Sequence, residues 1–278
     1  MKLLSFTLDG KALYGALRDG GIVTMNDRLG YETLRDALAA GTIERMREIA
    51  ANEKPDRTLD EIKFQPAIPR PEKILCAGIN YRAHAAETGR EPPKAPAVFA
   101  RFADTLVHHE GGMIRPRVSR EFDFEGELAV VIGRSGRHIS VERALDHVAG
   151  YTCFADGSVR DYQKFSVTSG KNFPGTGPLG PWIVTTDEIP DPTRLMLTTR
   201  LNSVEVQRSS TGLMIHSIPE IIAFCSAFTA LSAGDVIATG TPQGVGHSRK
   251  PPLWMKAGDV LEVEISGIGT LRAYVADE

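Results

Sequence analysis

The sequence has few cysteines and no long hydrophobic run. Its three cysteines, Cys76, Cys153 and Cys225, are widely separated and odd in number, so neither a disulfide framework nor a CxxC metal site is visible. The longest apolar runs, such as residues 128–132, span about five residues, whereas a membrane-spanning helix needs about 20. The N-terminal apolar stretch stops at Asp9, too early for a signal peptide. We therefore expect a soluble, cytoplasmic protein with no membrane partner.

The sequence also lacks a large excess of positive or negative charge. Lysine and arginine total 32 and aspartate and glutamate total 35, so nucleic acid is not an expected partner. Charged residues make up 24% of the chain and apolar residues 42%, which is typical of an ordered globular protein. The length of 278 residues fits one large domain, or one domain with a small appendage.

Closely spaced prolines divide the chain into two parts. Pro66, Pro69 and Pro71 exclude both helix and central strand, so we place a boundary between a small N-terminal domain, 1–68, and a larger domain, 69–278. Apolar runs on both sides of an Asp-Gly pair predict a hairpin in the first part, and helical patterns follow. The elements predicted there are strands at 3–8 and 12–17 and helices at 31–40 and 42–52.

Strand patterns outnumber helical ones in the larger part. Residues 127–132 form a nearly continuous apolar run, which predicts a strand covered on both faces. Ser217 and Glu220 form a capping box at the start of a helical stripe. Regular strand–helix–strand alternation is missing, which favours a mostly β, α+β fold over a doubly wound sheet. The other predicted elements are strands at 73–77 and 151–155, helices at 140–148 and 218–231, and a closing hairpin of 260–265 with 270–275.

Four acidic residues alternate with other residues just before this apolar run. Because side chains on a strand alternate between faces, Glu121, Asp123, Glu125 and Glu127 are predicted to share one face. At ~7 Å spacing and an effective dielectric near 20, each adjacent pair repels by about 2 kcal/mol. A hard divalent cation, Mg²⁺, Mn²⁺ or Ca²⁺, would compensate this charge. The alternative is an exposed edge strand whose carboxylates face water.

Asp156 is the candidate for a third ligand from another segment. It follows the predicted strand 151–155, and the end of a strand is a natural position for a ligating carboxylate. Asp161, five residues later, is the competing candidate. The alternative role of Asp156 is an Asx turn, in which the side chain bonds its own backbone.

His84 and Glu87 form a second candidate cluster. The alanine-rich segment around them favours a helix, on which residues three apart lie on one face and can touch. A carboxylate that holds an imidazole fixes its orientation and raises its basicity, as a general base for water requires. The alternative is a solvated helix pair with no catalytic task.

Two glycine-rich loops add further candidates. Lys171 lies in the loop 170–178, whose turns could aim its side chain inward; the alternative is a solvated lysine. The backbone N–H groups of the loop 239–246 could hold an anion or an oxyanion; the alternative is a tight connection without a ligand.

Seven motifs, taken in order, resemble the fumarylacetoacetate hydrolase family over about residues 70–278. One departure is visible, because the family usually has Asn-Asp-Val where this chain has Ala155-Asp156-Gly157. The acid is kept, but its altered neighbours put the choice of substrate in question. The motifs are GINYRAHAAE (78–87), DFEGELAVVIG (123–133), AGYTCFADGSVRDYQ (149–163), GKNF (170–173), GPLGPW (177–182), GDVIATGTPQGVG (234–246) and GDVLEVEISGIGTLR (258–272).

The resemblance implies a fold, a cofactor and a set of site residues. The fold is a mixed β-roll or sandwich catalytic domain with a small N-terminal α/β domain, commonly assembled as a homodimer. The cofactor is a divalent cation, Mg²⁺ or Mn²⁺, with Ca²⁺ as an alternative. The implied site contains metal ligands Glu125, Glu127 and Asp156, catalytic residues His84, Glu87 and Lys171, and substrate-pocket residues Arg82, Gln163, Gly240 and Thr241.

The implied reaction is metal-dependent hydrolysis of a C–C bond in acylpyruvate-like 1,3-dicarbonyl compounds, with His84 and Glu87 activating water. Lys171 and the N–H groups of residues 240–246 would stabilise negative charge. Two alternatives stay open. One is a decarboxylase, tautomerase or isomerase of 2-oxo acids such as oxaloacetate or an intermediate of aromatic catabolism, and the other is a binding protein without catalysis. The expected partner is a small 2-oxo acid or diketo acid.

Overall fold

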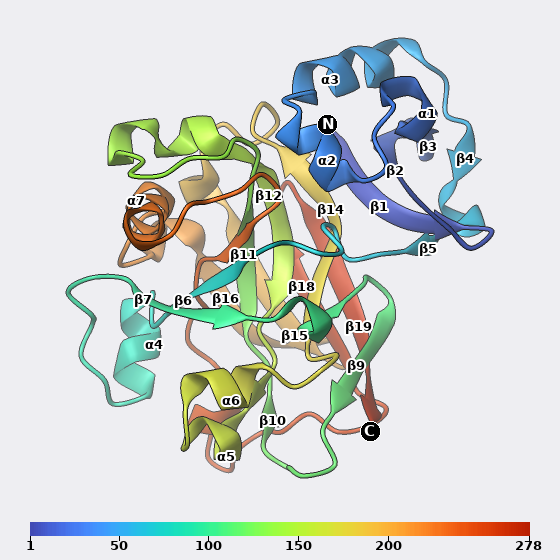
Figure 1. Ribbon diagram of the computed structural model, residues 1–278. Helices are drawn as coiled ribbons and strands as arrows, with labels where there is room; N and C mark the ends of the chain where they lie inside the picture. Colours follow the sequence, from blue (N-terminus) through green and yellow to red (C-terminus); the bar gives the residue numbers. More distant parts are fainter.

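A computed structural model describes residues 1–278, and its centre is a 12-stranded mixed sheet that runs through the whole molecule (Figure 1). Its strands follow the order β4-β3-β2-β1-β14-β12-β11-β17-β6-β7, with β5 paired to β1 and β8 paired to β14. The bounds are β1 Lys2–Leu8, β2 Lys11–Arg18, β3 Gly21–Thr24, β4 Arg57–Thr58, β5 Lys63–Phe64, β6 Ile74–Gly78, β7 Ala97–Arg101, β8 Leu106–Val107, β11 Gly126–Ile132, β12 Val148–Ala155, β14 Gly177–Thr185 and β17 Val236–Ala238.

A five-stranded sheet packs against the large one, and a two-stranded sheet lies near the end of β11. The five strands follow the order β16-β15-β18-β19-β9. Their bounds are β9 Gly111–Arg115, β15 Met196–Leu201, β16 Val204–Ser210, β18 Val260–Ile265 and β19 Gly269–Asp277, and the small sheet pairs β10 Phe122–Asp123 with β13 Ser158–Val159. The predicted closing hairpin is β18 with β19.

Short helices surround the sheets. In Figure 1, α1 to α3 cover the N-terminal strands, α7 lies at the left edge, and α4, α5 and α6 lie at the lower left. The α-helices are α1 Asn26–Leu29, α2 Leu34–Ala39, α3 Ile43–Asn52, α4 Arg82–Glu87, α5 Arg160–Gln163, α6 Val167–Lys171 and α7 Ile218–Phe228. The 3₁₀ helices are η1 Leu59–Glu61, η2 Ala103–Thr105, η3 Val141–His147, η4 Pro192–Arg194, η5 Thr211–Leu213 and η6 Gly246–Ser248. No helix combines the length and the apolar character that crossing a membrane requires.

β11 is covered on both faces, as its apolar run predicts. Leu128, Val130 and Ile132 point into the core shared with the five-stranded sheet and α7, whereas Ala129 and Val131 point into the core shared with the N-terminal helices. All five side chains are buried. Burying a valine, leucine or isoleucine side chain stabilises the fold by about 1.5–3 kcal/mol. The buried side chains of β11 therefore hold this central strand, and the acidic residues at its start, in a fixed place.

The mostly β, α+β fold is confirmed, and most predicted elements are present with shifted ends. The helix predicted at 140–148 is a 3₁₀ helix at Val141–His147, and the helix predicted at 218–231 ends at Phe228, after the capping box of Ser217 and Glu220. The hairpin around Asp9-Gly10 is β1 with β2.

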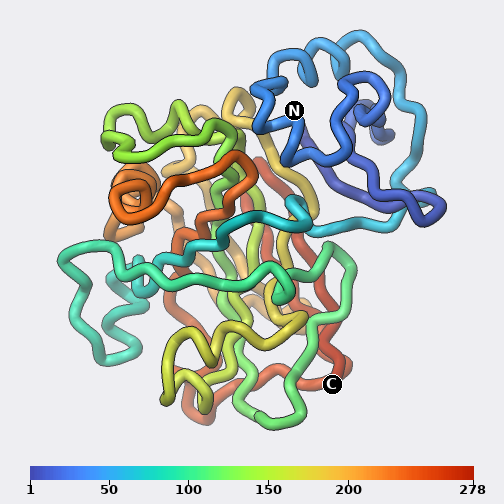
Figure 2. The backbone as a smooth tube through the Cα atoms, viewed as in Figure 1, coloured from blue at the N-terminus to red at the C-terminus, as the bar shows by residue number.

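The large sheet crosses the proposed domain boundary. Lys2 and Leu3 of β1 pair with Val184 and Ile183 of β14, so the N-terminal strands extend the sheet of the larger part. In Figure 2 the blue N-terminal segment lies at the upper right of the molecule, next to the strands that it joins. The division into 1–68 and 69–278 therefore stays a prediction from the prolines.

Candidate active site

The antiparallel pairing of β11 with β12 brings the three predicted metal ligands together. Gly126 lies opposite Ala155, so Glu125 just before β11 and Asp156 just after β12 meet at the same end of the pair. The backbone N–H of Asp156 donates to the carbonyl of Glu125 at 2.8 Å. One carboxylate oxygen from each of Glu125, Glu127 and Asp156 lies within 4.8 Å of the others, and all three residues are buried. We refer to these residues as the acid trio.

A buried lysine and a partly buried arginine hold Glu125. Lys171 Nζ donates to Glu125 Oε2 at 2.7 Å and also to Asp156, and Arg160 donates to Glu125 Oε1 at 2.6 Å. Burial raises the pKa of Glu125, but Lys171 and Arg160 outweigh it and hold that pKa at about 2. Burial lowers the pKa of Lys171, but the charges of Asp156 and Glu125 outweigh it and raise that pKa. Glu125 and Lys171 are therefore both charged at neutral pH.

Glu127 forms no ion pair. Its Oε2 accepts a hydrogen bond from the backbone N–H of Gly240 at 2.8 Å. Burial raises the pKa of Glu127, and the charges of Asp156 and Glu125 raise it further. A divalent cation would remove this repulsion, and three carboxylates are the ligands that Mg²⁺, Mn²⁺ and Ca²⁺ prefer. The acid trio therefore fits a divalent cation.

The predicted four-acid strand face is wrong. β10 and β11 are separate strands with a break at residues 124–125, so the regular alternation of side chains does not continue through the segment. Glu121 is partly exposed and lies 4.0 Å from Lys164. Asp123 is fully buried, but it is engaged by other groups.

Asp123 connects the loop 239–246 to Arg160. One of its oxygens accepts the backbone N–H of Gly246 at 2.7 Å, and the other accepts the N–H of His247 at 2.9 Å and Nε of Arg160 at 2.8 Å. Because Arg160 also donates to Glu125, Asp123 fixes the guanidinium that holds the acid trio. Sequence reasoning placed Asp123 on the metal-binding face and gave Arg160 no role.

α4 presents His84 and Glu87 on one face, as their spacing predicts. His84 Nδ1 lies 2.7 Å from Glu87 Oε1, and Glu87 Oε2 accepts the backbone N–H of Gly244 at 2.8 Å. His84 is buried. Since Nδ1 faces a carboxylate, Nε2 is the ring nitrogen left to receive a proton.

The turn between β6 and α4 is tied to the loop 239–246. Ile79 has φ of 52°, a left-handed conformation that turns the chain sharply after the strand. The side-chain amide of Asn80 donates to the carbonyls of Thr239 at 2.8 Å and His216 at 3.0 Å. The motif that begins at Gly78 thus positions α4 against the loop that contacts Glu87.

The loop 239–246 differs from its predicted role as an anion binder. Three of its backbone N–H groups donate to carboxylates of the protein itself, so they form no oxyanion hole. These pairs are Gly240 with Glu127, Gly244 with Glu87 and Gly246 with Asp123. The Thr241 hydroxyl donates to the carbonyl of Gly126 at 2.9 Å and accepts from Gln207 at 2.8 Å, so its hydrogen bonds also lie within the protein.

A cavity of about 680 Å³ adjoins the acid trio and the His84–Glu87 pair. Arg90 and Lys164 also line it, and neither has an ion-pair partner closer than 4.0 Å. Arg82 is exposed on α4 and does not line the cavity, and Gly240 does not line it either. The predicted site residues that do line it are His84, Glu87, Glu125, Glu127, Asp156, Gln163, Lys171 and Thr241.

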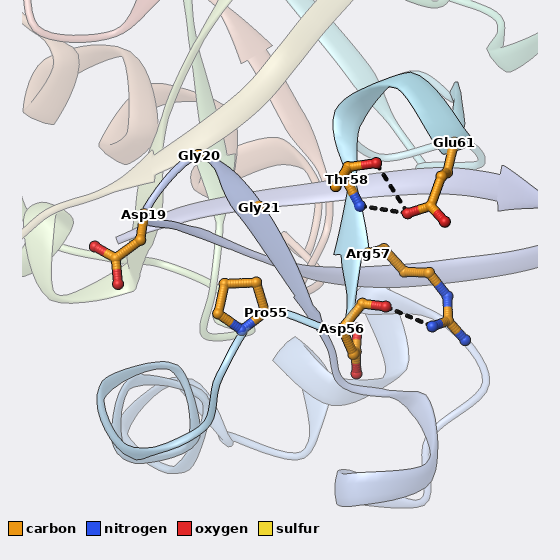
Figure 3. A pocket seen from close by; sticks show the side chains of 8 residues that line it. All are labelled: Asp19, Gly20, Gly21, Pro55, Asp56, Arg57, Thr58 and Glu61. Atoms are coloured by element: carbon orange, nitrogen blue, oxygen red, sulfur yellow. Dashed lines mark hydrogen bonds between the residues drawn. The ribbon is translucent and has the colours of Figure 1, made fainter.

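A second hollow, of about 400 Å³, lies on the N-terminal part of the chain (Figure 3). No hydrophobic residue lines it, and its acidic groups are satisfied locally. Glu61 accepts from the backbone and hydroxyl of Thr58, and Asp56 accepts from Thr24 and Arg28. No predicted site residue lies there, so the cavity at the acid trio is the candidate active site.

A family profile described as fumarylacetoacetate (FAA) hydrolase, C-terminal, matches residues 73–276. Among curated proteins, the human mitochondrial oxaloacetate tautomerase FAHD2A is 38% identical over 260 residues, which cover 91% of this chain and 83% of that protein. The oxaloacetate tautomerase YisK of Bacillus subtilis is 45% identical over 227 residues, which cover 78% and 74%.

Two solved structures extend the similarity over the full chain. A fumarylacetoacetate hydrolase from Exiguobacterium antarcticum has 33% identity and a TM-score of 0.85, covering 100% of both chains. The maleylpyruvate hydrolase of Sphingobium sp. SYK-6, in complex with manganese(II) and pyruvate, has 26% identity and a TM-score of 0.84, covering 100% of this chain and 99% of that one.

Proposed function

This chain belongs to the fumarylacetoacetate hydrolase family, and from that premise we propose that it is a divalent-cation-dependent tautomerase of small 2-oxo dicarboxylic acids such as oxaloacetate. The arrangement that carries the proposal is the His84–Glu87 pair beside the acid trio in one cavity. The similarity to two oxaloacetate tautomerases, at 38% and 45% identity, supports the same reaction.

The charges around the acid trio support an anionic substrate. Four buried carboxylates face two buried cationic side chains and one partly buried one, so bound Mg²⁺ or Mn²⁺ would leave one net positive charge next to the cavity. The carboxylates are Asp123, Glu125, Glu127 and Asp156, and the cations are Arg101, Arg160 and Lys171. Arg90 and Lys164, which lack close partners, add positive charge at the cavity wall. One carboxylate of a dicarboxylic acid matches the positive charge at the acid trio, and the other matches Arg90 and Lys164.

Tautomerisation needs one proton to move between carbon 3 and the enol oxygen. In the keto-to-enol direction His84 Nε2 takes the proton from carbon 3 and passes it to the enolate oxygen, while Glu87 holds the ring through Nδ1. In the other direction the same nitrogen takes the proton from that oxygen and passes it to carbon 3. A divalent cation held by the acid trio would supply Lewis acidity toward the carboxylate and 2-oxo oxygens of the substrate. The hydrogen bond from Gly244 to Glu87 keeps the base in place between turnovers.

The loop 239–246 favours tautomerisation over hydrolysis. C–C hydrolysis proceeds through a tetrahedral alkoxide at a second carbonyl, and such alkoxides are stabilised by preorganised donors. The N–H groups of Gly240, Gly244 and Gly246 are engaged by carboxylates, and Lys171 is held between Glu125 and Asp156. A proton transfer needs no such donors at a second carbonyl.

Hydrolysis of acylpyruvates is the second candidate. The specific observation in its favour is that the His84–Glu87 pair lines a cavity of about 680 Å³, which has room for a water molecule beside a small substrate. The maleylpyruvate hydrolase with the same fold supports this alternative at a lower identity of 26%.

The test compares both reactions on one purified preparation. Enol-to-keto conversion of oxaloacetate is followed by ultraviolet absorbance with Mg²⁺, with Mn²⁺ and with EDTA, and each rate is compared with the spontaneous one. Acylpyruvate cleavage is followed in parallel, with product identification. We expect metal-dependent acceleration of the first reaction. No acceleration of tautomerisation together with metal-dependent cleavage of an acylpyruvate would replace the proposal by the second candidate.

A further inference from the structure

Arg101 lies behind Asp156, outside the cavity. It is the last residue of the edge strand β7, and its side chain is fully buried. All three guanidinium nitrogens donate: Nε to the Thr105 hydroxyl at 3.3 Å, one terminal nitrogen to Asp156 Oδ1 and to the Gly157 carbonyl at 3.1 Å, and the other to the Thr176 hydroxyl at 2.7 Å. Because Arg101 does not line the cavity, it does not touch a substrate.

The groups that accept from Arg101 are themselves held. The Thr105 hydroxyl donates to the carbonyl of Phe102, and the Thr176 hydroxyl donates to the carbonyl of Phe173, each at 2.7 Å. The guanidinium also lies 5.6 Å from the ring centre of Phe154. Arg101 therefore has one well-defined orientation rather than the freedom of a surface arginine.

Gly157 is part of the same arrangement. A Cβ at this position would lie 2.2 Å from the carbonyl oxygen of Thr176 and 2.4 Å from the side chain of Met113, so only glycine fits without movement of the backbone. This close approach keeps the Gly157 carbonyl within reach of Arg101. The packing against Thr176 and Met113 therefore requires glycine at a position where the family pattern has a larger residue.

The two oxygens of Asp156 have different partners. Oδ1 faces Arg101, whereas Oδ2 faces Lys171 Nζ next to Glu125. Oδ1 is engaged by a guanidinium that is itself fixed by several hydrogen bonds, whereas Oδ2 accepts from the ammonium of Lys171, which lies at the end of a flexible side chain. Oδ2 is therefore the oxygen of Asp156 that can turn to a cation. Mg²⁺ requires near-ideal octahedral geometry, whereas Ca²⁺ takes six to eight oxygens and accepts a carboxylate through both of its oxygens.

We propose that Arg101 is a positioning residue that restricts Asp156 to one ligand oxygen and thereby favours Mg²⁺ over Ca²⁺ at the acid trio. This inference rests on the divalent cation of the proposed function. In this proposal the preference for Mg²⁺ over Ca²⁺ is set by Arg101, which contacts neither the cation nor the substrate. Partners of this kind typically change metal affinity by about 10–100-fold when removed.

The experiment measures the affinity of the metal-stripped, full-length protein for Mg²⁺ and for Ca²⁺ by titration calorimetry. We expect Arg101→Lys, which keeps the charge but cannot reproduce the four hydrogen bonds, to weaken Mg²⁺ binding at least about tenfold. Ca²⁺ binding should change less, because the released carboxylate can bind through both oxygens. The ratio of the two affinities should therefore shift toward Ca²⁺ by a similar factor.

Two further variants complete the test. Arg115→Met removes an arginine whose two side-chain hydrogen bonds go to Asp277 and not to the acid trio, and it should leave the ratio unchanged. Thr176→Val removes one anchor of Arg101 without changing any charge, and it should shift the ratio in the same direction by less. If Arg101→Lys fails to fold, as judged by circular dichroism, Thr176→Val carries the test alone.

The outcomes separate this inference from the proposed function. A wild-type protein that binds neither cation overturns the cation site, and with it both proposals. A wild-type protein that binds Mg²⁺, with an affinity ratio that is the same in Arg101→Lys and in Thr176→Val, overturns the role of Arg101 alone. An equal loss of both affinities also overturns it, because that result indicates general damage to the site.

Discussion

The cavity at the acid trio and the hollow of Figure 3 both collect acidic side chains, but their carboxylates have different surroundings. In the cavity, Glu125, Glu127 and Asp156 are buried and approach one another within 4.8 Å. In the N-terminal hollow, Glu61 and Asp56 each bond to neighbouring threonines, and none of the lining residues is hydrophobic.

The difference shows that the number of carboxylates in a hollow says little about chemistry. The acid trio differs because its carboxylates are buried and repel one another. Burial and the charges of Asp156 and Glu125 therefore raise the pKa of Glu127. In the N-terminal hollow, burial raises the pKa of Asp56, but hydrogen bonds from Arg28 and Thr24 outweigh it and lower that pKa. In the cavity Glu127 has no cationic partner, whereas Asp56 and Glu61 of the N-terminal hollow are paired or hydrogen-bonded.

The largest expected effect comes from Glu127→Gln, which removes the repulsion that defines the acid trio. Metal-dependent activity should disappear, together with the metal-induced rise in melting temperature. That rise corresponds to about 2.7 kcal/mol when the cation is at 100 times its dissociation constant. The metal-free variant should melt at least as high as metal-free wild type, because a neutral amide is easier to bury beside two carboxylates.

Glu121→Ala is the matched control for this substitution. Glu121 belongs to the same acidic segment but lies near the surface, 4.0 Å from Lys164, so activity and cation affinity should be nearly unchanged. Unchanged Mg²⁺ affinity in Glu127→Gln, measured by calorimetry, would contradict the assignment of the trio.

His84→Ala should be the next largest in effect, because it removes the base but none of the proposed ligands. Oxaloacetate tautomerisation should fall by at least about 10²-fold, the usual scale for a general base. Mg²⁺ affinity should stay at the wild-type value, since His84 bonds Glu87 and not the acid trio. Rates and metal content are measured on the same preparation. Full retention of activity would return His84 and Glu87 to a structural pair.

Gly240→Ala should have an intermediate effect, because it strains the loop without removing a ligand. Gly240 has φ of 98°, and a Cβ there would lie 2.7 Å from Cβ of Asn80. We expect a loss of about 1–3 kcal/mol in the free energy of unfolding. We also expect about a tenfold loss of activity as the N–H moves away from Glu127.

Gly258→Ala is the control that separates the loss of stability from the loss of activity. Gly258 has a similar φ of 90°, but a Cβ there meets nothing within 4 Å. It should lose stability in chemical denaturation without losing activity. Equal losses of activity in the two alanine variants would show that the hydrogen bond from Gly240 does not matter for catalysis.

The smallest effect is expected from Asp56→Asn in the N-terminal hollow. Activity should be unchanged, and the free energy of unfolding at neutral pH should fall by roughly 1 kcal/mol as the pairing with Arg28 is lost. Since the folded-state pKa of Asp56 is lowered, its contribution is present above the unfolded value of about 4 and is lost as pH falls below it. Denaturation curves of both proteins should therefore converge at acidic pH, and a gap that persists there would contradict the ion-pair explanation.

Sequence reasoning predicted which groups lie close together where a local pattern determines the distance between them. Glu127 and Asp156 lie at the ends of two strands that pair directly, and His84 and Glu87 lie one turn apart on a helix. In both cases the distance between the groups follows from the geometry of one element or one pair of strands. The predicted four-acid face failed because a break at residues 124–125 interrupts the alternation that the pattern assumes.

The partners that hold these groups could not be predicted in the same way. Arg101 contacts a carboxylate 55 residues away, and this contact depends on where the edge strand β7 joins the sheet. The Gly240 N–H points at Glu127, 113 residues earlier, for a similar reason. A lone arginine at the end of an apolar strand such as 97–101 is the signal that suggests a buried acidic partner, but it does not say which one.

The pairing of β1 with β14 has a consequence for the order in which the chain is made. Most partners of β1 lie in β2 and β5 and emerge from the ribosome early, whereas Val184 and Ile183, the partners of Lys2 and Leu3, follow about 180 residues later. At about 5–20 residues per second, this delay is roughly 10–40 s. The helices α2 and α3 also bury side chains in a core shared with β11, β12 and β14. The pairing of β1 is therefore completed only after β14 has been synthesised, and until then this segment is held by β2 and β5 alone.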